Sequence, residues 1–146
     1  LGIRVAPRTF PEGTRTAEDA AAATGVDVAQ IVKSLAFRAV RTDGTGFVVM
    51  ALVSGADRPD EKALAAAADA DHTERADAAE VRAATGYAIG GVPPFCHATT
   101  LPVFVDRHLL DHDEVWAAAG TPRDVFPLTP DELVRASGGT VADLAR

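Results

Sequence analysis

The segment Gly-Tyr-Ala-Ile-Gly-Gly-Val-Pro-Pro-Phe, residues 86–95, has the residue types best suited to binding a reacting group through the backbone. Gly90 and Gly91 have no Cβ, so another molecule can approach their backbone closely. Their N–H groups are candidate donors to a carbonyl oxygen or an oxyanion. Pro93 and Pro94 stiffen the loop and pre-organise these donors. A plain structural turn explains the same residues equally well at this stage.

Lys33 is the second candidate, because it lies between apolar residues in the segment Gln-Ile-Val-Lys-Ser, residues 30–34. An ammonium held in such a pocket binds a carbonyl or phosphate oxygen. Ser34, beside it, adds a hydroxyl. The alternative is that Lys33 is simply an outward residue on a half-buried strand.

Cys96 and His97 have the residue types of a nucleophile and its base. Adjacent side chains in an extended segment point to opposite faces, so these two are not expected to pair. A thiol mechanism would need a partner from elsewhere in the chain.

His108 and His112 have the i, i+4 spacing that binds zinc on an α-helix, and Asp111 and Asp113 add oxygen ligands. The segment contains neither the HExxH order nor a cysteine pair, and it also fits a polar turn between two strands. We therefore expect no metal and no cofactor, and keep a metal hydrolase as an alternative.

Capping signals and hydrophobic patterns predict the elements that position these residues. A helix over 17–24 is capped by Thr16 and Gly25, and a helix over 78–84 by Asp77 and Gly86. The other predicted elements are a helical turn over 28–32, strands over 34–40, 47–53, 102–105, 114–119 and 125–127, and helices over 59–68 and 130–137. Hairpin connections such as 42–46 favour a mixed, largely antiparallel α+β sheet.

The composition limits the class of protein. The chain has 146 residues, which fits a single domain over 1–146 with its own core. Its 21 acidic and 14 basic residues give a net charge of −7, which argues against a general nucleic-acid binder but permits a local basic pocket for a short RNA end. The single cysteine indicates a reducing compartment. No signal peptide and no apolar run of about 18 residues are visible, so we expect a cytoplasmic protein that does not bind membranes.

The order and spacing of these motifs resemble the YbaK family of aminoacyl-tRNA editing domains, which also occurs as the insertion domain of bacterial prolyl-tRNA synthetase. The resemblance runs from about Thr14 to Leu144. It rests on the segments 16–20, 28–35, 86–95, 102–106, 119–122 and 128–133. It implies a strongly curved mixed sheet, partly closed like a barrel and surrounded by helices.

The resemblance also implies roles for particular residues. Lys33 and Gly90 take the catalytic positions, and the residues implied to bind substrate are Ser34, Gly91, Val92, Pro93, Pro94, Phe95 and Asp106. Similar proteins hold the aminoacyl ester with the loop backbone and keep the lysine near the polar end of the substrate. A water molecule or the terminal adenosine hydroxyl assists the attack.

Two features depart from the family pattern. Cys96 stands where the family loop usually has glycine, and if that position needs a positive φ, the cysteine costs about 1–3 kcal/mol of strain. The family usually begins with another helix before the position here numbered Leu1, which implies that this helix is missing from the sequence.

The resulting hypothesis is hydrolysis, in trans, of the ester of a mischarged aminoacyl-tRNA, with Cys or Ala on tRNA(Pro). The expected partners are the acceptor end of the tRNA and prolyl-tRNA synthetase. The alternative is a non-catalytic module of the same fold that binds an aminoacyl-tRNA or a synthetase.

Overall fold

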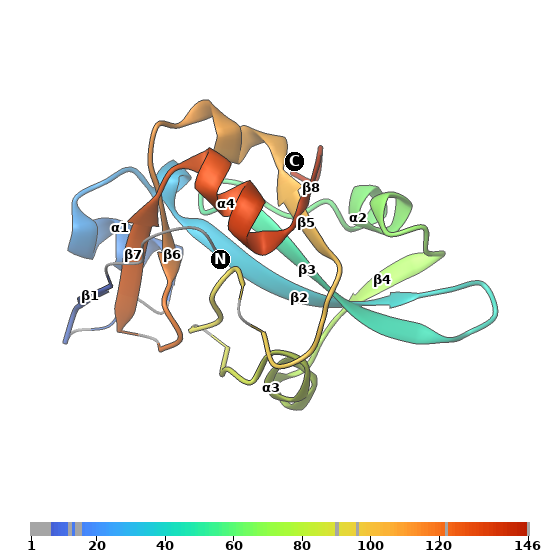
Figure 1. Cartoon of the computed structure of the whole chain (residues 1–146). Helices are drawn as coiled ribbons and strands as arrows, with labels where there is room; N and C mark the ends of the chain where they lie inside the picture. Colours follow the sequence, from blue (N-terminus) through green and yellow to red (C-terminus); the bar gives the residue numbers. More distant parts are fainter. Residues whose placement is uncertain are drawn as a thin grey trace.

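The computed structural model describes residues 7–11, 13, 16–89, 91–95, 97–121 and 123–145 (Figure 1). The helices are α1 (Ala17–Thr24), α2 (Glu61–Ala67), α3 (Ala78–Thr85) and α4 (Pro130–Ser137), with the 3-10 helices η1 (Val28–Gln30) and η2 (Arg107–Asp111). The strands are β1 (Arg8–Thr9), β2 (Val32–Val40), β3 (Gly46–Ser54), β4 (His72–Arg75), β5 (Val103–Asp106), β6 (Val115–Ala118), β7 (Asp124–Leu128) and β8 (Thr140–Ala142). None of the described helices is long and apolar enough to cross a membrane.

The ends of α1, α3 and α4 lie where the sequence predicts them to within one residue, whereas α2 begins at Glu61 after the capping residue Asp60 and not at Pro59. The Thr16 hydroxyl accepts a hydrogen bond from the backbone N–H of Asp19, and Gly25 ends α1 with a φ of 79°. Asp77 and Thr129 each open a helix with a capping box. These caps satisfy backbone groups that a helix end leaves without partners.

The five-stranded sheet has the order β4-β2-β3-β5-β8. The hairpin of β2 and β3 is antiparallel and continuous from the Val32–Ser54 pair to the Val40–Gly46 pair. The β3–β5 and β5–β8 pairs are parallel, so the sheet is mixed, as expected. β4 and β8 were not predicted, because both are short and neither is strongly apolar.

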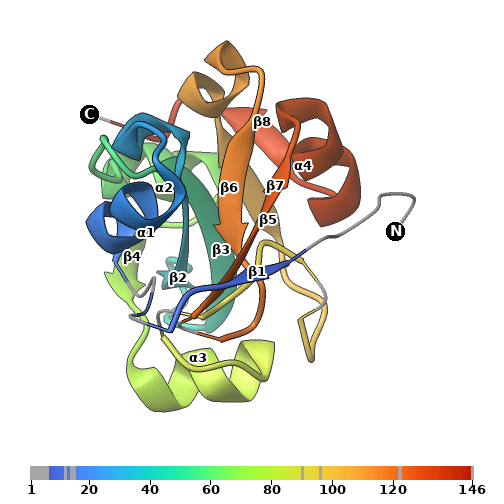
Figure 2. The same ribbon diagram turned by 90° about the vertical axis from the view of Figure 1, so that its left-hand side faces the viewer.

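A second sheet of three antiparallel strands has the order β1-β7-β6 (Figure 2). A bridge between Ile31 and Trp116 connects the end of η1 to β6. Within the described residues the strands form two separate sheets rather than one closed barrel. The barrel-like part of the predicted fold is therefore not confirmed.

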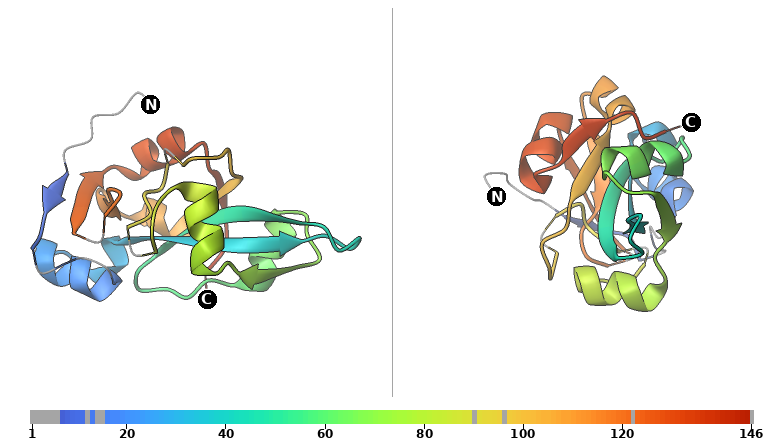
Figure 3. Two further views of the ribbon diagram at one scale, coloured as in Figure 1. Left: turned by 90° about the horizontal axis from the view of Figure 1, so that it is seen from below. Right: turned by 90° about the vertical axis from the view of Figure 1, so that its right-hand side faces the viewer.

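Core side chains cover both faces of the central hairpin. One face carries Met50 and Leu52, which pack with α3, β6 and α4, and the other carries Val49 and Val53, which pack with α2. The helices α2 and α3 accordingly lie on opposite sides of the five-stranded sheet (Figure 3). The uninterrupted apolar sequence of β3 is explained by this double burial.

Gly55, directly after β3, permits the close packing that forms one end of the candidate site. A Cβ at this position would lie 2.5 Å from the carbonyl oxygen of Val28 and 2.8 Å from the Cβ of Ala17. The Gly55 N–H donates to the carbonyl oxygen of Ile31 at 2.7 Å. The end of β3 thus contacts both α1 and η1, and a larger residue would push them apart.

Candidate active site

A pocket of about 430 Å³ lies where the start of β2 meets α1 and β6. The residues that line it come from six separate segments and are Thr16, Ala17, Glu18, Ala20, Ile31, Val32, Lys33, Ser34, Leu35, Gly55, Ile89, Val92, Trp116, Ala117, Ala118 and Val125. Most of this wall is apolar. Its polar side chains are Thr16, Glu18, Lys33 and Ser34, so the two candidates from β2 supply half of them.

Lys33 is half-buried at the second position of β2, and its Nζ donates to the backbone carbonyl oxygen of Asp57 at 2.5 Å. Burial lowers the pKa of Lys33, and the attraction of Glu18 and Asp57, which raises it, does not fully offset this effect. Burial has this sign because removal of water disfavours the charged form. The site therefore contains a partly desolvated ammonium next to a pocket.

Ser34 lines the pocket, and its buried Oγ makes no hydrogen bond to any described residue. Buried hydroxyls in proteins nearly always have a partner. The Ser34 hydroxyl therefore has a hydrogen-bonding capacity that no described residue uses.

The loop after α3 only partly matches its predicted role. Gly90 and Cys96 lie outside the described residues. The Gly91 N–H donates to the carbonyl oxygen of Ala88 at 3.0 Å, and a Cβ on Gly91 would lie 2.8 Å from the backbone of Thr121. The lack of a side chain at Gly91 thus serves packing within the chain. Its N–H is not free to act as the oxyanion donor that the sequence suggested.

The rest of this loop is buried. Val92 lines the pocket, whereas Pro93, Pro94 and Phe95 do not. The ring of Phe95 packs against Phe126 with a centroid separation of 5.7 Å. Phe95 thus supports the loop through this ring contact, and the two prolines are buried beside it.

His97 also supports the loop. Its Nε2 contacts the carbonyl oxygen of Pro93 at 2.7 Å. The Nε2 of His97 is therefore engaged in a contact with the loop backbone.

Asp106 does not line the pocket. Its Oδ1 accepts from the backbone N–H of Leu144 at 2.8 Å, and its Oδ2 accepts from the backbone N–H of His108 at 3.3 Å. The side chain is buried at the start of η2, so the aspartate caps this turn and fastens the C-terminal segment. This is the structural alternative to the substrate contact that the resemblance implies.

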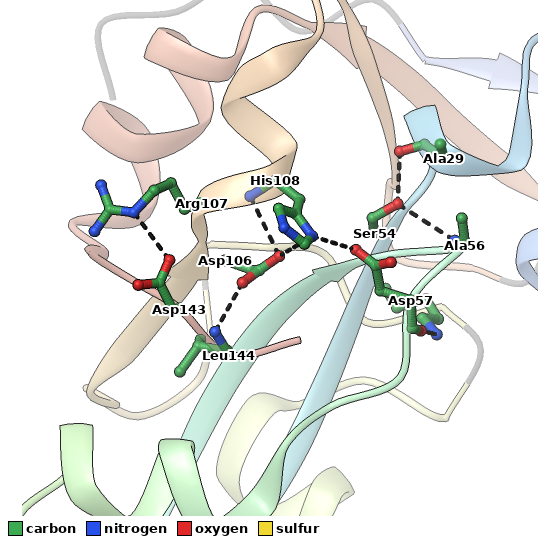
Figure 4. Close-up of polar contacts among 10 residues, drawn as sticks. Ala29, Ser54, Ala56, Asp57, Asp106, Arg107, His108, Asp143 and Leu144 are labelled. Carbon is green, nitrogen blue, oxygen red and sulfur yellow. Dashed lines mark hydrogen bonds and ion pairs between the residues drawn. The ribbon is translucent and has the colours of Figure 1, made fainter. Parts of the chain in front are cut away.

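The two histidines proposed as a zinc pair are not arranged as one. η2 is a 3-10 helix with about three residues per turn, and His112 follows it in extended conformation, so the i, i+4 geometry of an α-helix does not form. His108 instead contacts the Oδ2 of Asp57 at 2.9 Å and the Oδ2 of Asp106 at 3.6 Å (Figure 4). We assign these three side chains to an ion-pair network, because their polar atoms already bond to one another and to the backbone.

Ile89, Glu18 and Trp116 are among the pocket residues that were not identified from the sequence as parts of a site. Ile89 is 47% exposed at the pocket, and Glu18 lies in the first turn of α1. Trp116 is buried and also forms part of the pocket wall. The isolated isoleucine between small residues of the 86–91 loop is the one signal that could have marked such a contact.

The family is decided by comparison with known proteins. The family model described as "Aminoacyl-tRNA editing domain" matches residues 11–136. The chain belongs to the aminoacyl-tRNA editing domain family. The YbaK-like resemblance read from the motifs is thereby confirmed.

Relatives of this editing domain match it over most of its length. The uncharacterised protein YwhH of Bacillus subtilis is 32% identical over 124 residues, which cover 85% of this chain and 76% of YwhH. The crystal structure of a candidate trans-editing enzyme for prolyl-tRNA synthetase is similar with a TM-score of 0.86 and 45% identity, over 97% of this chain and 87% of that one. The crystal structure of hypothetical protein APE2540 is similar with a TM-score of 0.87 and 32% identity, over 99% and 93% of the two chains.

Proposed function

We propose that this editing domain hydrolyses, in trans, the ester bond of a mischarged aminoacyl-tRNA, with Cys or Ala esterified to tRNA(Pro). The observation that carries the proposal is the largely apolar pocket lined by Lys33 and Ser34, whose Oγ has no hydrogen-bond partner among the described residues. The family supports the substrate class, and the solved relative described as a candidate trans-editing enzyme for prolyl-tRNA synthetase supports the choice of tRNA.

The geometry suits a small aminoacyl group. Small side chains such as Ala17, Ala20 and Ala117 line the pocket, together with the larger Ile31 and Trp116. The aminoacyl side chain would lie against this wall. An apolar pocket distinguishes substrates that differ by one methylene by only about 1–3 kcal/mol. Selectivity between Ala and Cys is therefore expected to be moderate.

In the proposed reaction, a water oxygen attacks the ester carbonyl carbon. The bond between this carbon and the ribose oxygen breaks, the ribose oxygen takes a proton, and the products are the free amino acid and the uncharged tRNA. Negative charge develops on the carbonyl oxygen during the attack, and hydrogen-bond donors aimed at this oxygen lower the barrier. We assign this role to the Gly90 N–H and to the Lys33 ammonium, and assign Ser34 to a polar group of the substrate.

No side chain of this proposed site is required as a general base, since the substrate's terminal adenosine hydroxyl can orient or deprotonate the water. The proposal needs no metal and no cofactor for the same reason. The substrate is made where translation takes place, so we place the activity in the cytoplasm, with prolyl-tRNA synthetase as the expected partner.

The test is a deacylation panel with purified protein and tRNA(Pro) charged with Ala, Cys, Ser or Pro. We expect release of Ala or Cys well above the uncatalysed rate, and little release of the cognate Pro. Lys62→Ala is the matched control for a substitution of Lys33, because Lys62 is exposed on α2 and does not line the pocket. Binding of the charged tRNA without hydrolysis would contradict the proposal and favour the non-catalytic module.

A further inference from the structure

An ion-pair network lies beside the pocket and is not used in the reaction above (Figure 4). His108 contacts the carboxylate of Asp57 at 2.9 Å through Nδ1, and the carboxylate of Asp106 lies 3.6 Å from the same atom. Asp106 is 1% exposed and is fixed by the backbone N–H groups of Leu144 and His108. The imidazole therefore connects the carboxylate of Asp57, which lies on a loop, to the carboxylate of Asp106, which backbone hydrogen bonds hold in place.

The same loop holds the Lys33 ammonium. Lys33 Nζ donates to the backbone carbonyl oxygen of Asp57, whose carboxylate is only two carbon atoms further along the residue. The loop backbone is fixed on both sides, because the Asp57 N–H donates to the carbonyl oxygen of Ser54 at 3.0 Å and the Asp60 N–H to that of Leu144 at 2.6 Å. Rotation of the Asp57 side chain is thus the main freedom left to this carboxylate.

The charges around Lys33 favour rotation of the Asp57 carboxylate toward the Lys33 ammonium. Glu18 and Asp57 attract the ammonium, while Arg75 and Arg58 repel it, and the attraction raises the pKa of Lys33 against the larger effect of burial. A carboxylate released next to a partly desolvated ammonium would form an ion pair with it. The ammonium would then be neutralised where the substrate oxygen must bind.

The contacts of His108 oppose that outcome. Its hydrogen bond with Asp57 and the charges of Asp106, Asp57 and Asp111 raise the pKa of His108 above its ordinary value, so the ring carries a proton at higher pH than a free histidine. The adjacent guanidinium of Arg107 is bonded to a different carboxylate at 3.0 Å and does not compete for Asp57. The cation next to the Asp57 carboxylate in this network is therefore His108.

We propose that His108 is a positioning residue that holds the Asp57 carboxylate away from the Lys33 ammonium and so keeps this ammonium available to substrate in the pocket. This inference rests on the proposed function for its consequence in catalysis. The contacts that it invokes exist in the protein without substrate and can be tested separately.

The catalytic test is a double-mutant cycle in the deacylation assay. We expect His108→Ala to lower kcat/KM by about tenfold, because the released carboxylate captures Lys33. Asp57→Asn removes the capturing charge, so the double variant His108→Ala/Asp57→Asn should recover to within about twofold of Asp57→Asn alone. A double variant as slow as His108→Ala would overturn the proposal. His72→Ala is the matched control, since His72 is an exposed histidine paired with Asp71 and Glu74 away from the pocket.

A second variant separates positioning from a structural effect. His108→Asn keeps a side-chain N–H donor for Asp57 and should retain most of the activity that His108→Ala loses. His108 is exposed, so both variants are expected to fold, which circular dichroism and thermal melts check. Equal losses in the alanine and asparagine variants would contradict the proposed role.

The direct test does not depend on catalysis. Titration of the Lys33 side-chain signal by NMR should give a higher pKa in His108→Ala than in wild type, and in the double variant the same pKa as in Asp57→Asn alone. An unchanged Lys33 pKa in His108→Ala would overturn the inference even if activity fell. The expected NMR shifts in a protein that hydrolyses no charged tRNA would refute the proposed function and leave the positioning role standing.

Discussion

Lys33 and Ser34 are consecutive on β2 and pair with Val53 and Leu52 of the neighbouring strand, yet both line the same pocket. Consecutive side chains of a strand leave opposite faces of the sheet. The pocket therefore extends around the start of β2 and is lined by residues from both faces of this strand. This arrangement makes separate predictions for the two residues.

Removal of the Lys33 ammonium should abolish most of the deacylation. We expect Lys33→Met, which keeps the length of the aliphatic stem, to lower kcat/KM by about 100-fold, the scale seen when one donor to a developing oxyanion is lost. The melting temperature should stay near that of wild type, because the lost hydrogen bond is to a loop carbonyl. Full activity in this variant, measured with Ala-tRNA(Pro) and Cys-tRNA(Pro), would exclude Lys33 from the site.

Ser34→Ala should separate stability from activity. The buried hydroxyl lacks a partner among the described residues, so its removal should leave the free energy of unfolding unchanged or raise it, by at most about 1 kcal/mol. Activity should fall if the hydroxyl binds substrate. Denaturant unfolding and steady-state kinetics on the same preparation check both parts, and a clear loss of stability would show that Ser34 has a structural partner.

The adjacent glycines of the loop should respond differently. Gly90→Ala is expected to cause a large loss of activity with a modest loss of stability, since we assign the close approach of the ester to this residue. Gly91→Ala should instead destabilise the fold by about 1–3 kcal/mol, because the new Cβ would lie 2.8 Å from the backbone of Thr121. Thermal melts and deacylation rates distinguish the two, and a Gly90→Ala variant with normal rates would show that this loop is only structural.

Cys96 is expected to be dispensable. In the proposed mechanism no covalent intermediate forms, so Cys96→Gly, which restores the residue usual in the family, should keep or raise activity. A thiol nucleophile predicts the reverse, namely a folded but inactive glycine variant and an acyl-thioester that mass spectrometry can trap.

Activity should survive exhaustive treatment with EDTA. The proposed chemistry uses backbone and ammonium donors, and the i, i+4 histidine pair is not assembled, because η2 ends before His112. His112→Ala should likewise retain the wild-type rate. Loss of activity on chelation with recovery on addition of zinc would revive the metal-hydrolase alternative.

Local features of this protein follow from its sequence. The caps Thr16 and Asp77 were predicted correctly because a capping side chain bonds to a backbone N–H only a few residues away. The β2–β3 hairpin was predicted for a similar reason, since its turn chemistry and apolar pattern are contained in one continuous segment. The family could also be recognised from the sequence, because the resemblance depends on the order and spacing of short motifs and not on contacts between them.

The composition of the site was decided by the tertiary structure. Trp116, Ile89 and Glu18 join Lys33 and Ser34 in one pocket only because β6, the loop after α3 and the start of α1 pack against β2. The roles of Gly91 and Asp106 were likewise undetermined, since a glycine backbone or a buried carboxylate serves substrate or scaffold according to what lies next to it. Those neighbours, Thr121 and Leu144, are about thirty or more residues away along the chain. Sequence patterns record the preferences of a few adjacent residues, whereas contacts at this separation form only when the whole chain packs.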